Sequence, residues 1–161
     1  WARGQAWAIY GYTACFRETN DSIFLNFAKD IADMIMDRVK TEDAIPYWDY
    51  DAPVTKETPR DVSAASVTAS AMIELSTMVP DGQKYLDYAE KILKSLSSDA
   101  YLAKVGDNQG FILMHSVGSL PNGSEIDTPL NYADYYYLEA LKRFMELKKL
   151  RVENGELRVI Q

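Results

Sequence analysis

The sequence predicts an all-α fold that forms part of a toroid built from two layers of helices. Five segments show helical periodicity, and only a few short runs are typical of strands. The helical segments alternate between helices that are apolar on every side and helices that carry a single apolar stripe. Because an ordinary four-helix bundle would give every helix a similar stripe, this alternation favours buried inner helices covered by outer ones.

The first and third helical segments are apolar all round. One covers residues 5–16, and the other begins after Asp61 and continues to about Met78. Neither segment has a polar face, so we expect both helices to be enclosed. Asp61 stands immediately before its helix and is expected to be the N-cap. Cys15 lies in the first of these helices and is expected to be inert packing.

The second and fourth helical segments have the pattern of surface helices. The second is capped by Asp21 or Ser22 and runs to about Val39, and the fourth opens at Pro80-Asp81. The buried stripe expected for the second helix consists of Phe24, Phe27, Ala28, Ile31 and Ile35. The stripe expected for the fourth consists of Tyr85, Tyr88, Ala89, Ile92, Leu93 and Leu96.

The remaining segments connect these helices or follow them. They are a long connection at 40–60, a helical turn at 100–104, an extended run at 111–114, a loop at 115–129 with a turn at Asn122-Gly123, and a last helix at 132–149. The alternation around Asn154-Gly155 is compatible with a small hairpin over 151–161. A connection as long as 40–60 is usually functional in a compact domain.

Composition excludes several classes of partner for a chain that we expect to be one domain, residues 1–161. The formal net charge is -7, which argues against nucleic acid or an anionic membrane surface as partner. A single cysteine excludes an internal disulfide and a cysteine-based zinc site, and we expect neither metal nor cofactor. No signal peptide and no apolar run of membrane length is apparent.

Five helices cannot close a double ring. Inner helices that are apolar on every side would leave bare apolar faces if this chain stood alone, and soluble monomers rarely expose such patches. We therefore expect the chain to be completed by the missing N-terminal half of the barrel or by another copy of itself.

The stretch Trp1-Ala2-Arg3-Gly4-Gln5-Ala6-Trp7 is the candidate binding site. A helix that begins near Gly4 places Arg3 and Trp7 on one face, with Arg3 at the helix N-terminus, where anions are favoured. A guanidinium binds a carboxylate in a bidentate way, and an indole offers an apolar face to a sugar ring. These residues indicate recognition of an acidic carbohydrate. The alternative, which spacing alone favours, is an ordinary ion pair of Arg3 between two core tryptophans.

Four stretches resemble, in the same order, the unsaturated glucuronyl hydrolases of glycoside hydrolase family 88. They are Trp1–Trp7, Pro46-Tyr47-Trp48-Asp49-Tyr50-Asp51-Ala52-Pro53, Pro59-Arg60-Asp61-Val62-Ser63-Ala64-Ala65, and Tyr132-Ala133-Asp134-Tyr135-Tyr136-Tyr137-Leu138-Glu139-Ala140-Leu141. The related rhamnogalacturonyl hydrolases have Arg-Gly-Asn-Gly-Trp where this chain has Arg3-Gly4-Gln5-Ala6-Trp7, so Gln5 and Ala6 favour family 88.

The resemblance implies an (α/α)6 barrel and a substrate that ends in a 4,5-unsaturated uronic acid, left by polysaccharide lyases. In such enzymes an aspartic acid protonates C4 and activates water for C5, and the hemiketal that results releases the next sugar. The family's two catalytic aspartates lie N-terminal to the tryptophan-arginine signature. The resemblance therefore implies that this chain contains no catalytic residue and is a C-terminal portion of the barrel.

The resemblance also assigns substrate-binding residues. The signature contributes Trp1, Arg3, Gln5 and Trp7. Members that act on sulfated fragments have a Ser-x-x-Ser-x-Lys pattern, which Ser116 and Ser119 match, although Pro121 replaces the lysine. Loss of that cation places a preference for sulfated substrates in doubt.

Other candidates favour ordinary structural roles. The carboxylates of Asp49 and Asp51, or of Glu125 and Asp127, are candidates for the acid/base pair of an inverting glycosidase. Carboxylates in loops, however, are more often helix caps, turn residues or solvated charges. His115 is the only histidine and has no nearby cluster of ligands. Two rival functions remain beside a glucuronyl hydrolase fragment: a rhamnogalacturonyl hydrolase fragment and a non-catalytic helical carbohydrate-binding module.

Overall fold

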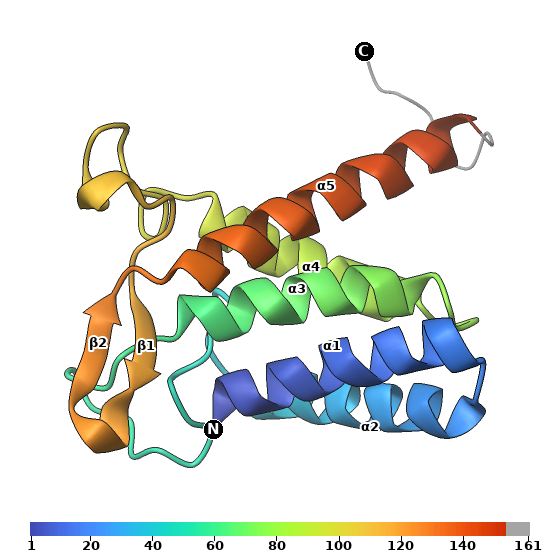
Figure 1. The fold of residues 1–161 in the computed structure, drawn as a ribbon, viewed down its shortest axis with the longest axis horizontal. Helices are drawn as coiled ribbons and strands as arrows, with labels where there is room; N and C mark the ends of the chain where they lie inside the picture. The colour runs from blue at the N-terminus through green and yellow to red at the C-terminus, as the bar shows by residue number, and fades with distance from the viewer. Residues whose placement is uncertain (154–161) are drawn as a thin grey trace.

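The computed structural model describes residues 1–153, which form five α-helices and one two-stranded hairpin (Figure 1). The helices are α1 (Ala2–Thr19), α2 (Ser22–Arg38), α3 (Val62–Ser76), α4 (Gln83–Leu96) and α5 (Asn131–Glu153). The strands are β1 (Ser116–Ser119) and β2 (Ser124–Thr128), and single 3-10 turns cover Asn108–Gly110 and Leu120–Asn122. No helix within this described part of the chain is both long and apolar enough to cross a membrane.

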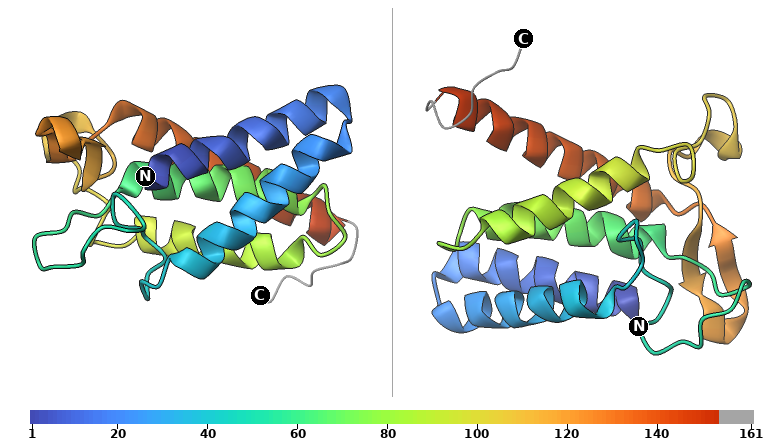
Figure 2. Two further views of the ribbon diagram at one scale, coloured as in Figure 1. Left: turned by 90° about the horizontal axis from the view of Figure 1, so that it is seen from below. Right: turned by 180° about the vertical axis from the view of Figure 1, so that it is seen from behind.

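The helices form two layers. α1, α3 and α5 run in the same direction and make one layer, and α2 and α4 cover that layer from behind (Figures 1 and 2). α3 lies in the middle and contacts α1, α4 and α5, while α2 packs on α1. The odd-numbered helices are thus the inner ones, as the alternation of apolar patterns predicts.

α3 is the enclosed helix at the centre of the core. Every residue from Val62 to Ser76 is buried except Glu74, which confirms the prediction of an enclosed third helix. Its many Ala and Ser residues allow neighbouring helices to approach on several sides. The helix begins at Asp61, whose carboxylate accepts hydrogen bonds from the backbone N–H groups of Ser63 and Ala64, so the predicted N-cap is also confirmed.

The outer helices bury one stripe each. In α2 the predicted stripe is partly wrong, because Phe27 is 47% exposed and stacks on Tyr12, while Ala28 and Ile35 are buried as expected. In α4 the predicted stripe is buried except for Tyr88, which is half-buried. Pro80 belongs to a turn, and the helix begins later, at Gln83.

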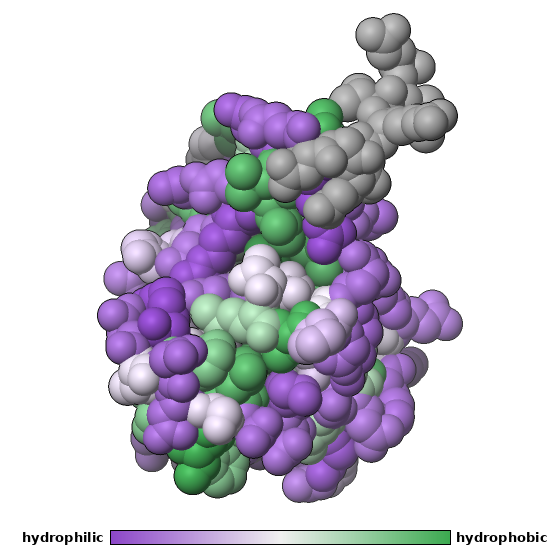
Figure 3. Space-filling model, turned by 90° about the vertical axis from the view of Figure 1, so that its right-hand side faces the viewer, coloured by the Kyte–Doolittle hydropathy of each residue, from purple (hydrophilic) through white to green (hydrophobic). Residues whose placement is uncertain are grey.

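α1 and α5 are buried on one side only, so residues 1–153 do not enclose the first helix, as expected for an inner helix when this chain stands alone. Cys15 is exposed rather than packed. Large apolar side chains of α5 are also exposed, including Tyr135, Leu138 and Met145. Figure 3 shows hydrophobic surface among hydrophilic residues at the end of the molecule where α1 meets α2 and α3 meets α4.

The connection after α4 differs from the sequence prediction. A single hydrogen-bonded turn lies slightly earlier than predicted, since the N–H groups of Tyr101 and Leu102 donate to the carbonyl of Ser98 at 3.0 and 2.8 Å. Leu102 then pairs as an isolated antiparallel bridge with Leu113. That bridge confirms the extended character of the run 111–114.

The segment 115–129 is a β-hairpin rather than a loop. β1 and β2 pair in antiparallel fashion, and the register shifts between Ser116 and Val117. The predicted turn is correct, with Gly123 in the left-handed region at φ 64°. At the other end of the chain, α5 continues to Glu153, so 151–153 are helical; the rest of the predicted hairpin, 154–161, lies outside the described residues.

Candidate functional site

The candidate site lies at the end of the molecule where α1, α3 and α5 begin (Figure 1). The β1–β2 hairpin and the 40–60 connection meet there. The N–H of Ala2 donates to the carbonyl of Trp48 at 3.0 Å, which joins the connection to α1. The N–H of Val62 donates to the carbonyl of His115 at 3.2 Å, which joins the hairpin to α3.

Arg3 occupies the centre of this junction and is 5% exposed. Its Nη1 contacts Asp61 Oδ2 at 3.1 Å and Ser63 Oγ at 3.1 Å. The same nitrogen also donates to the carbonyl of Val117, and Nη2 donates to the carbonyl of Gly118 at 2.7 Å. A guanidinium has five N–H donors, so Nε–H and one hydrogen of Nη2 remain without a partner among residues 1–153.

Asp61 holds Arg3 in place and links three elements. Its side chain is 0% exposed, and its Oδ1 accepts hydrogen bonds from the N–H and the hydroxyl of Ser63 at 3.1 and 2.5 Å. The N–H of Val117 in β1 also donates to Oδ1, at 3.4 Å. Burial raises the pKa of the Asp61 carboxyl above its ordinary value. The hydrogen bonds from Ser63 and the charge of Arg3 lower that pKa, but burial has the larger effect.

Aromatic rings lie over the Arg3 guanidinium. Its Cζ lies 4.9 Å from the centre of the Trp1 ring and 5.2 Å from that of Tyr132. Gly4 makes room for the indole, because a Cβ at that position would lie 2.9 Å from Trp1 Cε3. Trp7 packs instead against Tyr136, with ring centres 5.0 Å apart.

The ordinary structural alternative for Arg3 is right in part, and recognition of an acidic carbohydrate stays a prediction. Arg3 does form a buried ion pair, as the ordinary structural reading requires. Trp1, however, is 53% exposed and is not a core residue.

A pocket of about 370 Å³ opens beside Arg3. It is lined by Trp1, Arg3, Trp48, Val117, Gly118, Ser119, Leu120 and Pro121. The structure thus brings the predicted residues Trp1, Arg3 and Ser119 to one pocket. A lining that is mostly apolar, with two indoles and a few polar groups, suits a sugar ring.

Other predicted binding residues do not line this pocket. Gln5 and Trp7 of α1 are not among its lining residues, and neither is Ser116. Ser116 is fully buried, and its Oγ has no hydrogen-bond partner among residues 1–153. Contact of these three with substrate stays a prediction. The lining residues to which the sequence assigned no binding role include Trp48, Val117, Gly118 and Leu120, although Trp48 stands in the conspicuous stretch Pro46–Pro53 of the long 40–60 connection.

The other carboxylates do not form an acid/base pair at this pocket, since none of its lining residues is acidic. Asp51 is 83% exposed and pairs with Arg38. Asp127 is 60% exposed and pairs with His115 Nδ1 at 2.6 Å. Within residues 1–153, no three His, Cys, Asp or Glu side chains gather as metal ligands would.

Comparison with known proteins gives a consistent class of relatives. The sequence model of glycosyl hydrolase family 47 matches residues 4–148. The unsaturated glucuronyl hydrolase of Formosa agariphila is 47% identical over 91% of this chain and 37% of its own length. The enzyme of the same name from Bacillus sp. strain GL1 is 34% identical over 89% of this chain and 38% of its own.

Solved structures agree with these relatives. A crystal structure of an unsaturated glucuronyl hydrolase specific for heparin is 61% identical, covers 92% of this chain and 40% of its own, and has a TM-score of 0.90. A Streptococcus agalactiae enzyme solved with dGlcA-GalNAc6S is 32% identical over 89% of this chain and 39% of its own, with a TM-score of 0.82.

The chain thus spans about 37–40% of the length of these relatives. Their fold confirms that it is part of an (α/α)6 barrel. The number of the matching family model, 47, differs from the family 88 expected from the signature, whereas the named relatives agree with that signature. The chain therefore belongs to the glycosyl hydrolase family whose model it matches, and the relatives that it resembles over about nine tenths of its length are named unsaturated glucuronyl hydrolases.

Proposed function

We propose that this chain is the substrate-binding part of an enzyme that removes a 4,5-unsaturated glucuronyl residue from lyase-generated glycosaminoglycan oligosaccharides. The observation that carries the proposal is the pocket in which Arg3, held by Asp61, lies between Trp1 and the β1 strand. The names of the relatives support the same substrate class.

The contacts of Arg3 give it a defined role in this proposal. Asp61 and the carbonyls of Val117 and Gly118 fix the guanidinium, so it loses little freedom when a ligand binds. We propose that its two remaining N–H donors bind the uronate carboxylate. Trp1 and Trp48 provide apolar surface for the sugar faces, and Ser119 provides a hydroxyl at the pocket edge.

The proposed reaction is hydration of the enol ether. A carboxylic acid gives its proton to C4, water adds to C5, and the resulting hemiketal opens and releases the next sugar with its hydroxyl restored. No acidic residue lines the pocket among the described residues, so we place the acid on a part of the barrel that this chain lacks. The chain by itself is then expected to bind without turnover.

The same reasoning defines the partner. α1 and α5 each expose one side, including Leu138 and Met145 at 51% and 69%. We propose that the N-terminal part of the barrel covers these faces, or that another copy of the chain does. A compact monomer in light scattering, with no tendency to associate, would favour the non-catalytic binding module instead.

The test combines binding and turnover in one sample. The chain is mixed with an unsaturated glucuronyl disaccharide, and tryptophan fluorescence and the ultraviolet absorbance of the unsaturated uronate are followed together. We expect a saturable fluorescence change at constant absorbance. Arg3→Met should weaken binding by about tenfold or more, since one charge-assisted contact is lost, whereas Lys91→Met on α4 should not.

Two results would count against the proposal. Loss of the uronate absorbance with the purified chain would show that it contains the acid/base group. Binding that is absent, or equal in the Arg3→Met variant and the wild type, would show that the Arg3 pocket is not the sugar site.

A further inference from the structure

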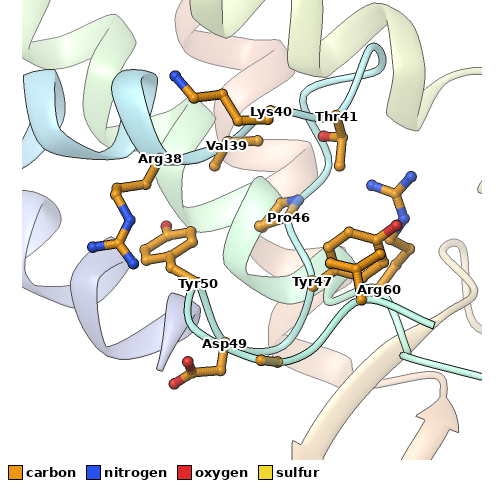
Figure 4. Close-up of a pocket in the computed structure, with 11 residues that line it drawn as sticks. Arg38, Val39, Lys40, Thr41, Pro46, Tyr47, Asp49, Tyr50 and Arg60 are labelled. Atoms are coloured by element: carbon orange, nitrogen blue, oxygen red, sulfur yellow. The ribbon is translucent and has the colours of Figure 1, made fainter.

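A second pocket lies on the other side of the 46–50 stretch from the Arg3 pocket. It has a volume of about 410 Å³ and is bounded by the end of α2 and by the connection that follows (Figure 4). Tyr47 and Asp49 line this second pocket, whereas Trp48 between them lines the Arg3 pocket. The two pockets share no lining residue, so they are separate cavities with a common wall.

The floor of the second pocket is apolar and aromatic. It consists of Val39, Pro46, Tyr47, Tyr50, Ala52 and Val54. Figure 4 shows Pro46 at its centre, with Tyr50 on one side and Tyr47 on the other. Aromatic and proline faces of this kind pack against the C–H face of a pyranose ring.

The rim of the pocket is cationic. Arg38, Lys40 and Arg60 line it, against a single carboxylate, that of Asp49. Each of these cations also pairs with a carboxylate just outside the lining, so the pocket offers cationic groups to a ligand rather than a net positive charge. Figure 4 places Arg38 and Arg60 on opposite sides of the floor, so the two guanidinium groups flank whatever occupies it.

Arg60 is the fixed cation of the rim. It is held by the carbonyl of Ile45 and by Asp43 at 3.3 Å, and its Cζ lies 4.4 Å from the centre of the Tyr47 ring. Both hydrogen bonds use Nη1, so the Nε and Nη2 atoms of Arg60 have no hydrogen-bond partner among residues 1–153. A guanidinium placed in this way presents donors to an anion without reorganising.

Arg38 and Lys40 are the adaptable cations. Arg38 pairs with Asp51, which is 83% exposed, and Lys40 pairs with Asp37, which is 79% exposed. Exposed ion pairs of this kind contribute little net free energy, so an anionic ligand can replace the carboxylate partner.

We propose that this second pocket binds an acidic sugar unit of an oligosaccharide without catalysing its cleavage. The sugar ring packs on Tyr47, Pro46 and Tyr50, and its sulfate or carboxylate groups contact Arg60 and Arg38. The pocket holds a chain of acidic sugars to the protein independently of the proposed function, since it uses none of the residues of the Arg3 pocket.

The experiment uses a heparin tetrasaccharide with a saturated non-reducing end, which lacks the unsaturated residue proposed for the Arg3 pocket. Binding is measured by isothermal titration calorimetry at low and high salt. We expect saturable binding that weakens with salt, and at least a tenfold loss of affinity in Arg60→Gln, since a charge-assisted contact is removed. A hyaluronan tetrasaccharide, which carries carboxylates alone, shows whether sulfate is needed.

Two further variants keep the test independent of folding. Val54 is 64% exposed at the pocket, so Val54→Glu should fold normally and repel the anion. The matched control, Lys91→Gln on α4, changes the net charge by the same amount as Arg60→Gln but lies outside the pocket. An equal loss of affinity in the control would show diffuse charge attraction and overturn the proposal.

The remaining outcomes are equally decisive. Absence of binding by the wild-type chain overturns the proposal. So does binding that is lost in Ser119→Trp, which fills the Arg3 pocket, but is retained in Val54→Glu. Failure of the Arg3 pocket to bind the unsaturated disaccharide would leave this result unaffected, so the two proposals fail separately.

Discussion

Replacement of Asp61 by asparagine tests how Arg3 is held. The Asp61 carboxylate is 0% exposed and has one oxygen 3.1 Å from Arg3 Nη1. The other oxygen accepts from the N–H and hydroxyl of Ser63. Asparagine has the same shape, but its NH2 group must face either the guanidinium or the donors of the helix cap. The variant therefore keeps the volume and removes the charge.

The structure allows the size of the effect to be bounded. Removal of one partner of a buried ion pair costs about 3–5 kcal/mol, because the other charge remains uncompensated. Asparagine and aspartate are about equal as N-caps, so the cap itself changes little. The carbonyls of Val117 and Gly118 still accept from Arg3 and offset part of the loss. We expect Asp61→Asn to lower the free energy of unfolding by about 3 kcal/mol.

The assay is urea unfolding at neutral pH, followed by far-ultraviolet circular dichroism, with the slope unchanged between variants. Asp21→Asn is the matched control, because Asp21 is also a helix N-cap but is exposed and accepts one bond, from the N–H of Ile23. We expect that control to change the free energy by less than about 0.5 kcal/mol. A loss below about 1 kcal/mol in Asp61→Asn would refute the view that the ion pair fixes Arg3.

Three further predictions concern other parts of the structure. Gly4→Ala should shift the Trp1 indole, because the new Cβ would lie 2.9 Å from the ring, and it should change tryptophan fluorescence while the free energy of unfolding stays within about 1 kcal/mol. Burial raises the pKa of Asp43, but the hydroxyl of Tyr101 at 2.5 Å and further donors outweigh it and hold that pKa below its ordinary value. Asp43 therefore stabilises the fold above its unfolded pKa and loses this contribution as pH falls through its folded pKa, so stability should fall less steeply in acid for Asp43→Asn than for the wild type. Cys15 should react with a thiol reagent in the native protein as fast as an exposed cysteine, and slow reaction would contradict its exposure.

The helices could be predicted from the sequence because their signals are local. Asp61 caps α3, and the run of small and apolar residues that follows has no polar face, so its position in the core follows directly. The exposure of Cys15 and Phe27 could not be predicted in the same way. Both residues lie on faces of α1 and α2 that the other elements among residues 1–153 cover only in part.

The hairpin was missed because its sequence lacks a strand pattern. β2 is almost entirely exposed and has no apolar alternation, and two of its residues, Glu125 and Asp127, have positive φ. Its partner strand is held instead by long-range contacts, since the carbonyls of Val117 and Gly118 accept hydrogen bonds from Arg3. No local pattern contains that information.

The candidate site was predictable in part for the same reason. Trp1 and Arg3 stand in one short motif, so their proximity follows from the helix that they begin. The pairing of Arg3 with Asp61 joins residues 58 positions apart, and Trp48 reaches the pocket through the connection between α2 and α3. These contacts depend on how α1 packs against α3. The periodicity of the sequence predicts that both helices belong to the inner layer, but it does not predict which residues of the two helices meet.

The central claim is that the Arg3 pocket takes an acidic sugar, and the indole N–H signals of the three tryptophans test it most directly. In a nuclear magnetic resonance titration with an unsaturated glucuronyl disaccharide, the signals of Trp1 and Trp48 should shift together and saturate at one dissociation constant, because both line the pocket. Shifts confined to Trp7, or no shift of any indole signal at saturating disaccharide, would contradict the claim.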